Sequence, residues 1–343
     1  MKKIAVIRIL AILSVLVVGQ MMGIKSQASG KDAGEAAALT KLIAMQKQKG
    51  ATIDDDIDNL EQYEWDDGHL VAVSWVEKSV QGNVSFAEFP YLGEIVCRRN
   101  ALTDIDVTKN TVLDTLDVAE NALTYIDVTR NTVLDSLDVS TNALSDIDVS
   151  QNIFLQQLVV YGNQLTTLDV SHNTDLFDLN CNFNQISTLD FSNNALLGYL
   201  ECAENQLTVL DLSRNSYLKE LNCAENAITS LDLSNCPLVE QLTCYSNQIA
   251  TLCLTGAAKL MHLSCFNNNL SQLDISDCAE LVCLWCWENL KLRYVDVSQN
   301  KKLGNFQSDY ESWNPLNPSP TPASVSPTPI SPTATPVIEP TPT

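Results

Sequence analysis

Apolar residues recur along this chain with a period of twenty-one residues. From Pro90 to Asn300 the sequence divides into ten consecutive units, of which the last has one extra residue. With Pro90 as position 1, apolar side chains fall at positions 3, 6, 8, 13, 16 and 18, and asparagine falls at positions 11 and 21. A further unit begins at Leu70, and a partial unit follows at 301–306. Self-similarity at a fixed short period predicts a solenoid of stacked coils.

Each unit consists of two near-copies of one pattern, in which two leucines, a third apolar residue and an asparagine keep the same spacing. Positions 6 and 8 alternate with polar neighbours, and so do positions 16 and 18, which predicts one half-buried strand in each half-unit. Stacked units would place these strands in two parallel β-sheets that face each other over a narrow apolar core. We therefore expect a mainly β solenoid of about eleven repeats over residues 70–313, with one short strand per half-repeat.

Units such as PYLGEIVCRRNALTDIDVTKN and SYLKELNCAENAITSLDLSNC resemble the leucine-rich repeats of bacterial proteins, specifically the nested twenty-one-residue class called IRREKO. The resemblance covers residues 70–308 and implies a leucine-rich-repeat solenoid with a role in recognition. Residues 29–69 resemble the N-terminal cap of such arrays, with a helix expected over 33–48 and with Trp65 and Trp75 sealing the first coil. Phe306, Tyr310 and Trp313 are the candidates for closing the other end.

The two ends of the chain differ from the repeats. Residues 1–28 combine a basic start, an apolar run and a small-x-small site at 26–28, which predicts a secretory signal peptide and no membrane insertion after its cleavage. An uncleaved anchor is the alternative. Residues 314–343 are rich in Pro, Thr and Ser, which predicts a disordered linker or tail of polyproline II character. The expected localisation is therefore secreted or on a cell surface.

The chain carries a formal net charge of −22. So acidic a protein is a poor partner for nucleic acid or for anionic membranes, because both repel it. It remains compatible with basic partners and with cations.

Asparagine occupies position 11 in every one of the ten units. An amide both donates and accepts, so a stacked column of amides can bind the backbone of its own turn and of the next coil. We expect a structural ladder formed by Asn100, Asn121, Asn142, Asn163, Asn184, Asn205, Asn226, Asn247, Asn268 and Asn289. Position 21 behaves likewise, except at Cys236, Ala257 and Cys278.

Position 8 alternates between cysteine and valine, which indicates that it requires a small apolar residue. Neighbouring cysteines in a parallel ladder point the same way, a poor geometry for disulfides, so we expect buried free thiols there. Four cysteines lie outside this column, and their pairing stays open: Cys236, Cys253, Cys278 and Cys283. Cys283 forms a Cys-x-x-Cys pair with Cys286 but falls at position 5. Strand alternation then turns the two side chains to opposite faces, which disfavours a shared metal or a redox couple.

Position 17 is aspartate in nine of the ten units and should face solvent between the inward positions 16 and 18. A straight row of carboxylates does not converge as calcium ligands do. We therefore interpret the row as a solvated ladder that discourages aggregation, with weak cation binding as the alternative.

Positions 7 and 9 point outward from the first strand, and they vary while the core positions barely change. Such a variable outward face is the natural recognition surface of a repeat protein. Aromatic residues gather on it near the C-terminal end, and exposed apolar patches of this kind mark binding sites. The candidate ligand-binding residues are Tyr245, Phe266, Trp285, Trp287 and Glu288, with Tyr161 and Phe183 as weaker members. The alternative is that these rings cover a weakly capped end.

No catalytic constellation is visible. The three histidines, His69, His172 and His262, fall at unrelated places, and neither a phosphate-binding glycine loop nor a zinc motif is present. We expect no enzyme activity, no cofactor and no metal. The sequence favours an exported bacterial binding or adhesion module that contacts a protein or carbohydrate on a cell surface, and the alternative is a structural spacer or scaffold without a specific ligand.

Overall fold

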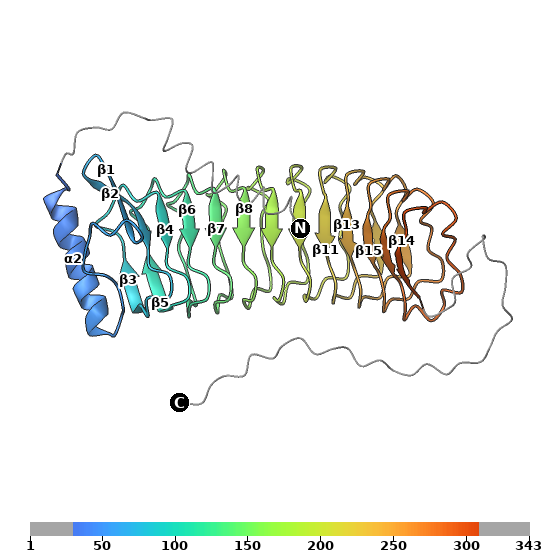
Figure 1. Ribbon diagram of the computed structural model, residues 1–343, viewed down its shortest axis with the longest axis horizontal. Helices are drawn as coiled ribbons and strands as arrows, with labels where there is room; N and C mark the ends of the chain where they lie inside the picture. Colours follow the sequence, from blue (N-terminus) through green and yellow to red (C-terminus); the bar gives the residue numbers. More distant parts are fainter. Residues whose placement is uncertain (1–29, 309–343) are drawn as a thin grey trace.

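The structure is a computed structural model that describes residues 30–308, and it is a curved stack of short coils closed at one end by a helix (Figure 1). The signal sequence and the Pro/Thr/Ser tail predicted above, together with Tyr310 and Trp313, lie outside the described residues. No helix of the described part is long and apolar enough to cross a membrane.

The first strand of every coil joins one long sheet. Successive coils pair in parallel with partners twenty-one residues apart, for example Leu200 with Leu221, and twenty-two apart at the two ends of the array. The first pair of strands is antiparallel. In order, the thirteen strands are β1 (Tyr63–Asp66), β2 (His69–Ser74), β4 (Glu94–Val96), β6 (Thr115–Asp117), β7 (Ser136–Asp138), β8 (Gln157–Val159), β9 (Asp178–Asn180), β10 (Tyr199–Glu201), β11 (Glu220–Asn222), β13 (Gln241–Thr243), β15 (His262–Ser264), β16 (Cys283–Trp285) and β17 (Asn305–Gln307).

The second half of the coil forms a ladder in only two places. These are the parallel pairs β3 (Gln81–Ser85) with β5 (Ala101–Asp106) and β12 (Ser230–Asp232) with β14 (Thr251–Cys253). Elsewhere neighbouring coils share one backbone bond on this side, such as the 2.8 Å bond from Gln185 N to Leu165 O. The mainly β solenoid with parallel sheets is confirmed, but one strand per half-repeat holds only at these two pairs.

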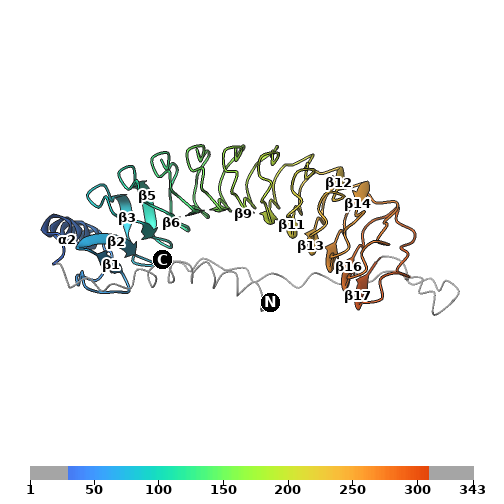
Figure 2. The ribbon, with the colours of Figure 1, turned by 90° about the horizontal axis from the view of Figure 1, so that it is seen from above.

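Curvature explains the difference between the two sides. Figure 2 shows the solenoid as an arc with β9, β11, β13 and β16 on its inner side. Strands must lie about 4.8 Å apart to keep a continuous ladder. The inner side holds this spacing, and the outer side of an arc is necessarily longer. We call the inner side, formed by the thirteen-stranded sheet, the concave face.

The core is the narrow space between the two halves of each coil. The side chains at positions 3, 6, 8, 13, 16 and 18 are buried, as the apolar pattern predicts, except that Leu189 and Val297 are only partly buried. A coil contributes only a few of these side chains, so the core is continuous only because coils stack.

Helix α2 (Ala33–Gln48) closes the N-terminal end over the range that the sequence marks as helical. Asp32 caps it by accepting from the backbone of Gly34 and Glu35, and Leu39 and Ile43 are buried against the first coil. Gln46 both donates to Asn83 O and accepts from Gln81 N, so it satisfies the free edge of β3.

The two tryptophans of the cap are placed differently. Trp75 is fully buried and donates to the hydroxyl of Tyr63. Trp65 is partly buried against the core and donates to Ile57 O. At the other end, Phe306 on β17 packs partly buried over the last coil and pairs in register with Leu284.

Candidate functional site: the concave face

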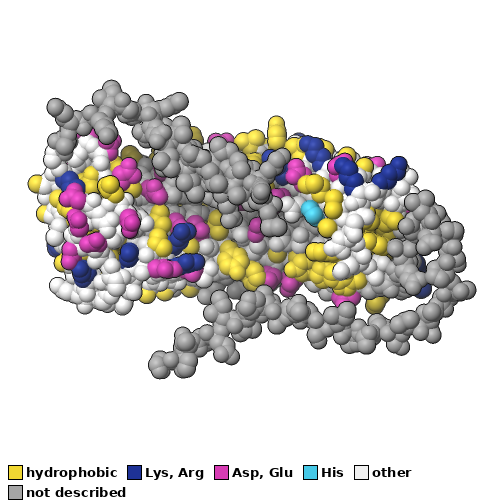
Figure 3. All heavy atoms as spheres, viewed as in Figure 1, with side chains coloured by type: hydrophobic (Ala, Val, Ile, Leu, Met, Phe, Trp, Pro, Cys, Tyr) yellow, Lys and Arg dark blue, Asp and Glu magenta, His cyan; other side chains and the backbone are white. Residues whose placement is uncertain are grey.

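Strand alternation turns positions 5 and 7 of each coil onto the concave face, because position 6 is buried in the core. Position 9 follows the strand and continues the same surface. The predicted ligand-binding residues lie at positions 7, 9 and 10, so the sheet brings them to one side of the molecule. Figure 3 views this side, and hydrophobic side chains gather on it towards the right, over the C-terminal coils.

Three aromatic rings from consecutive coils form a continuous stack. The rings of Tyr245 and Phe266 lie 4.5 Å apart between centroids with planes inclined by 5°, and those of Phe266 and Trp287 lie 4.2 Å apart at 7°. The in-register sheet places position 9 of each coil directly beside that of the next, so the rings stack along the solenoid axis. Both faces of the Phe266 ring are therefore covered, whereas Tyr245 and Trp287 are each covered on one face, and all three side chains are half-buried. We call these three residues the aromatic stack.

Trp285 extends the aromatic stack sideways from position 7. Its ring lies 6.4 Å from that of Trp287 at 55°, and the side chain remains 37% exposed. Ser264 is the in-register neighbour of Trp285 on β15, and its side chain lies on the concave side of a strand whose Leu263 is in the core. The Ser264 hydroxyl is nevertheless buried and has no hydrogen-bond partner. An unmet hydroxyl among aromatic rings is a costly feature in a folded protein.

The remaining predicted ligand-binding residues stand apart from the stack or at its border. Tyr161 and Phe183 form an edge-to-face pair at 5.1 Å, three coils towards the N-terminus. Phe183 is 44% exposed and lies at position 10, with a φ of 55°. Glu288 lies at position 10 of the last full coil, beside Trp287, and is exposed.

A second aromatic cluster on the same face was missed by the sequence analysis. The rings of Phe177 and Tyr199 lie 5.2 Å apart, and the Lys219 ammonium sits 5.8 Å and 5.9 Å from their centroids. A Cβ at Gly198 would lie 2.5 Å from the ring of Phe177, so only glycine leaves room for that ring. The available signal was a glycine at position 4 between an aromatic and a lysine in neighbouring units.

Carboxylates are crowded on the concave face. Burial raises the pKa of Asp117 and Asp135, and the pKa of Glu94 rises for the same reason with a contribution from Asp114. Farther along, burial followed by repulsion from Glu201 and Glu240 raises the pKa of Glu220. The surface therefore holds negative charge that water does not fully stabilise.

The asparagines at position 11 form a hydrogen-bonded ladder. Asn184 is typical: its amide donates to the carbonyls of Val160, Cys181 and Asn182 at 3.0, 3.2 and 3.3 Å, and its oxygen accepts from Leu165 N at 3.0 Å. The bonds outside its own turn therefore reach the preceding coil, not the next one as expected from the sequence. The ladder supports the concave face from behind and leaves the outward positions free to vary.

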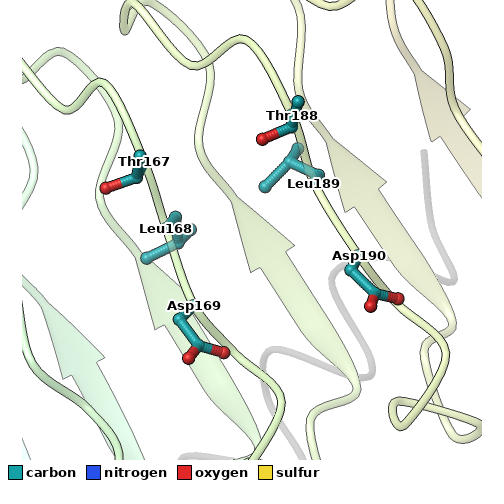
Figure 4. Close-up of a pocket in the computed structure, with 6 residues that line it drawn as sticks. All are labelled: Thr167, Leu168, Asp169, Thr188, Leu189 and Asp190. Carbon is teal, nitrogen blue, oxygen red and sulfur yellow. The ribbon is translucent and has the colours of Figure 1, made fainter.

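The aspartates at position 17 form turns instead of a binding site. Each accepts from the backbone two residues on, as Asp169 does from Ser171 N at 2.9 Å. Figure 4 shows Asp169 and Asp190 on neighbouring coils with carboxylates that run parallel and do not converge. Hydrogen bonds from the serine two residues on lower the pKa of both. Within residues 30–308 no group of three His, Cys, Asp or Glu side chains could hold a metal ion.

None of the eleven cysteines, all of which lie in the described part, forms a disulfide. The seven at position 8 are buried, as are Cys236 and Cys278. Cys286 is 1% exposed whereas Cys283 is half-buried on the concave side of β16. The three histidines are likewise scattered: His69 contacts Glu35 at the cap, and His262 lies exposed on β15.

Comparison with known proteins gives the fold. No family model matches the chain, and no curated protein matches it. Among solved structures, the functional domain of InlJ from Listeria monocytogenes, described as including a cysteine ladder, is 31% identical with a TM-score of 0.59, over 68% of this chain and 57% of that one. The chain thus spans little more than half of that structure.

Two further structures extend the likeness. The internalin InlF from Listeria monocytogenes is 20% identical with a TM-score of 0.56, over 80% of this chain and 95% of that one. The leucine-rich-repeat ectodomain of the receptor kinase GASSHO1/SCHENGEN3 from Arabidopsis thaliana is 21% identical with a TM-score of 0.66, over 78% and 38%. The described part of the chain is therefore a leucine-rich-repeat solenoid, similar in fold to internalins and to a receptor ectodomain.

Proposed function

We propose that this protein is a recognition module that binds a polypeptide partner on its concave face, with the aromatic stack as the main contact. The proposal rests on one observation: the aromatic stack, together with Trp285, lies on a sheet face that no element of the described chain covers. Large, rigid aromatic side chains supply contact area at a small cost in conformational entropy, which is why they dominate binding energy at interfaces.

The geometry of the rings favours a polypeptide over a glycan. Sugars bind aromatic residues by lying on an exposed ring face, and here the faces of Phe266 are covered on both sides by its neighbours. A row of ring edges instead offers a ridged apolar surface. Aliphatic and aromatic side chains of a partner can pack between such ridges by shape complementarity.

The likeness to internalins and to a receptor kinase ectodomain in complex with CASPARIAN STRIP INTEGRITY FACTOR 2 supports the same function. It also supports an exported protein that works at a cell surface, as does the signal-like sequence of residues 1–28. The mechanism is surface complementarity without chemistry. The spacer alternative has no observation of its own in its favour, since a spacer needs no aromatic stack on its concave face.

A peptide selection tests this function. A phage-displayed library of random linear dodecapeptides is selected on the solenoid and on the variant Tyr245→Ala/Phe266→Ala/Trp287→Ala. The matched control, Tyr125→Ala/Val209→Ala/Tyr217→Ala, removes three side chains that are at least as exposed but lie elsewhere on the coil. We expect peptides that bind the parent and the control and lose the triple variant by at least about a hundredfold, since truncating such anchors costs about 2 kcal/mol or more.

Equal recovery on the parent and on the stack variant would refute the site. A glycan array run in parallel separates the ligand classes, because glycan binding that depends on the stack would refute a polypeptide ligand. Unfolding midpoints of all three proteins show whether each variant keeps the fold.

A further inference from the structure

The charged side chains around the aromatic stack indicate the chemistry of the partner. From the coil of Phe177 to that of Trp287, positions 4, 5, 7, 9 and 10 carry seven carboxylates and one cation, Lys219. The seven are Asp178, Glu201, Glu204, Glu220, Glu225, Glu240 and Glu288. The concave face is thus both apolar and strongly negative over the same coils.

The carboxylates lie against the rings and not on a separate surface. Burial, then Glu225 and Glu204, raise the pKa of Tyr245 in the stack. Burial, then Glu220 and Glu240, raise the pKa of Tyr199 in the second cluster. Aromatic and acidic side chains are therefore interleaved, so a ligand that touches one group also meets the other.

The first coils provide a contrast within the same face. There the two arginines at positions 9 and 10 neutralise nearby acids: Arg98 pairs with Asp117 at 3.4 Å, and Arg99 pairs with Glu77 and Glu120 at 2.8 and 2.9 Å. In the C-terminal coils a neutral side-chain amide can take the place of such an arginine. Gln241, for example, donates to Glu220 at 3.0 Å. An amide satisfies a carboxylate oxygen without cancelling its charge.

Lys219 shows how this face accommodates a cation. Its ammonium lies over the rings of Phe177 and Tyr199, next to Glu220 in the chain. A lysine or arginine from outside would find the same combination near the stack, with its methylene stem on apolar ring edges and its charge among carboxylates.

We infer that the partner of the concave face is a basic polypeptide segment, in which Lys or Arg side chains meet Glu220, Glu225 and Glu240 while neighbouring apolar side chains pack on the aromatic stack. The inference rests on the proposed function, since it names the chemistry of the ligand for the same site. Charge complementarity identifies the occupant: an acidic or neutral segment would leave these carboxylates crowded and without compensation.

The test uses the same peptide library with a charge variant, Glu220→Gln/Glu225→Gln/Glu240→Gln. The matched control, Asp104→Asn/Asp146→Asn/Asp175→Asn, removes the same formal charge from exposed aspartates outside the concave face. We expect peptides retained by the parent to be enriched in Lys and Arg relative to the unselected library. We expect their affinity to fall at least about tenfold on the charge variant, and also when salt rises from about 0.05 to 0.5 M, but not on the control.

Peptides that need the stack but show no excess of basic residues, or that bind the charge variant as well as the parent, overturn the inference and leave the proposed function standing. A selection that yields no stack-dependent peptide overturns both. Equal losses on the charge variant and on the control would also overturn the inference, because net charge alone would then explain binding.

Discussion

The two halves of each coil start from nearly the same sequence and reach different structures. The first half forms a continuous sheet, places a left-handed residue at position 10 in all ten coils, and satisfies its asparagine fully. The second half forms a ladder at only two pairs of strands. Within the ten coils of residues 90–300 its only residue with a positive φ is Gly256, and its buried asparagines leave their side-chain oxygens without partners.

This difference is the reason that we assign recognition to one half only. In the first half the backbone is held by the sheet and by the asparagines behind it. The position 7 side chain accepts from the backbone two residues on in only four of the ten coils, at Asp117, Asp138, Asn180 and Asn222, so the turn does not depend on that side chain. In the second half the outward aspartate at position 17 forms the turn, through bonds such as that from Ser213 N to Asp211. A position that must form a turn cannot vary to fit a partner.

The largest expected effect is on the free energy of unfolding, which should fall more when an asparagine is removed from position 11 than when one is removed from position 21. Asn205, at position 11, accepts from Ile186 N at 2.9 Å, and Ile186 is fully buried. Asn205→Ala should leave that N–H unpaired and cost about 3 kcal/mol. Asn194, at position 21, donates to Val170 O and Asn173 O but has an unmet oxygen. Asn194→Ala should cost only about 1 kcal/mol, since it also removes that oxygen.

Urea-induced unfolding at neutral pH measures both variants, with the exposed neighbour changed in Gln206→Ala as a control that should shift nothing. Equal midpoints for Asn205→Ala and Asn194→Ala would show that the two halves are held in the same way. The two asparagines lie only eleven residues apart, in adjacent coils, so differences in cooperativity along the array have little effect on the comparison.

A smaller effect tests the left-handed position. Glu204 occupies position 10 with a φ of 52°, whereas Arg214, at the equivalent place of the second half, has no positive φ. At Glu204 glycine relieves the strain of the positive φ. At Arg214 there is no such strain, so glycine only raises the entropy of the unfolded chain and thereby lowers stability. We expect Glu204→Gly to leave stability unchanged or slightly higher, and Arg214→Gly to lower it, with a difference of about 1 kcal/mol. Equal losses in thermal unfolding would contradict the assignment.

Much of this architecture follows from the sequence alone. The period fixes the stacked coils, the apolar positions fix the core, and the helix at Ala33–Gln48 follows from its composition and its Asp32 cap. Position 17 also carried a usable signal, because aspartate followed two residues later by Ser or Thr is typical of a side-chain turn.

The rest depends on curvature and on contacts between coils. The apolar pattern is the same in both halves, so it does not reveal that only one side keeps ladder spacing. Position 10 carries residues such as Phe183 and Glu225, which give no hint of a left-handed conformation. The Phe177 cluster depends on the space over Gly198 in the adjacent coil, and the face-to-face order of the stack depends on side-chain rotamers.

The smallest expected effect is on how stability depends on pH, and it has opposite signs on the two sides of the coil. Burial raises the pKa of Asp117 on the concave face, so the folded protein holds this proton more tightly and stability falls as pH rises above about 3.9, the usual unfolded value. Hydrogen bonds from Ser171 lower the pKa of Asp169, so its contribution to stability is present above that value and is lost as pH falls through the folded pKa.

Asp117→Asn should therefore raise the urea midpoint at pH about 7, and Asp169→Asn should lower it slightly, because an exposed carboxylate contributes little. Each difference should shrink as pH falls through the folded pKa of the parent carboxyl, which then becomes neutral like the amide that replaces it. Shifts of the same sign at neutral pH would mean that the two carboxylate columns share one environment, and the distinction between a recognising half and a turn-forming half would lose its electrostatic support.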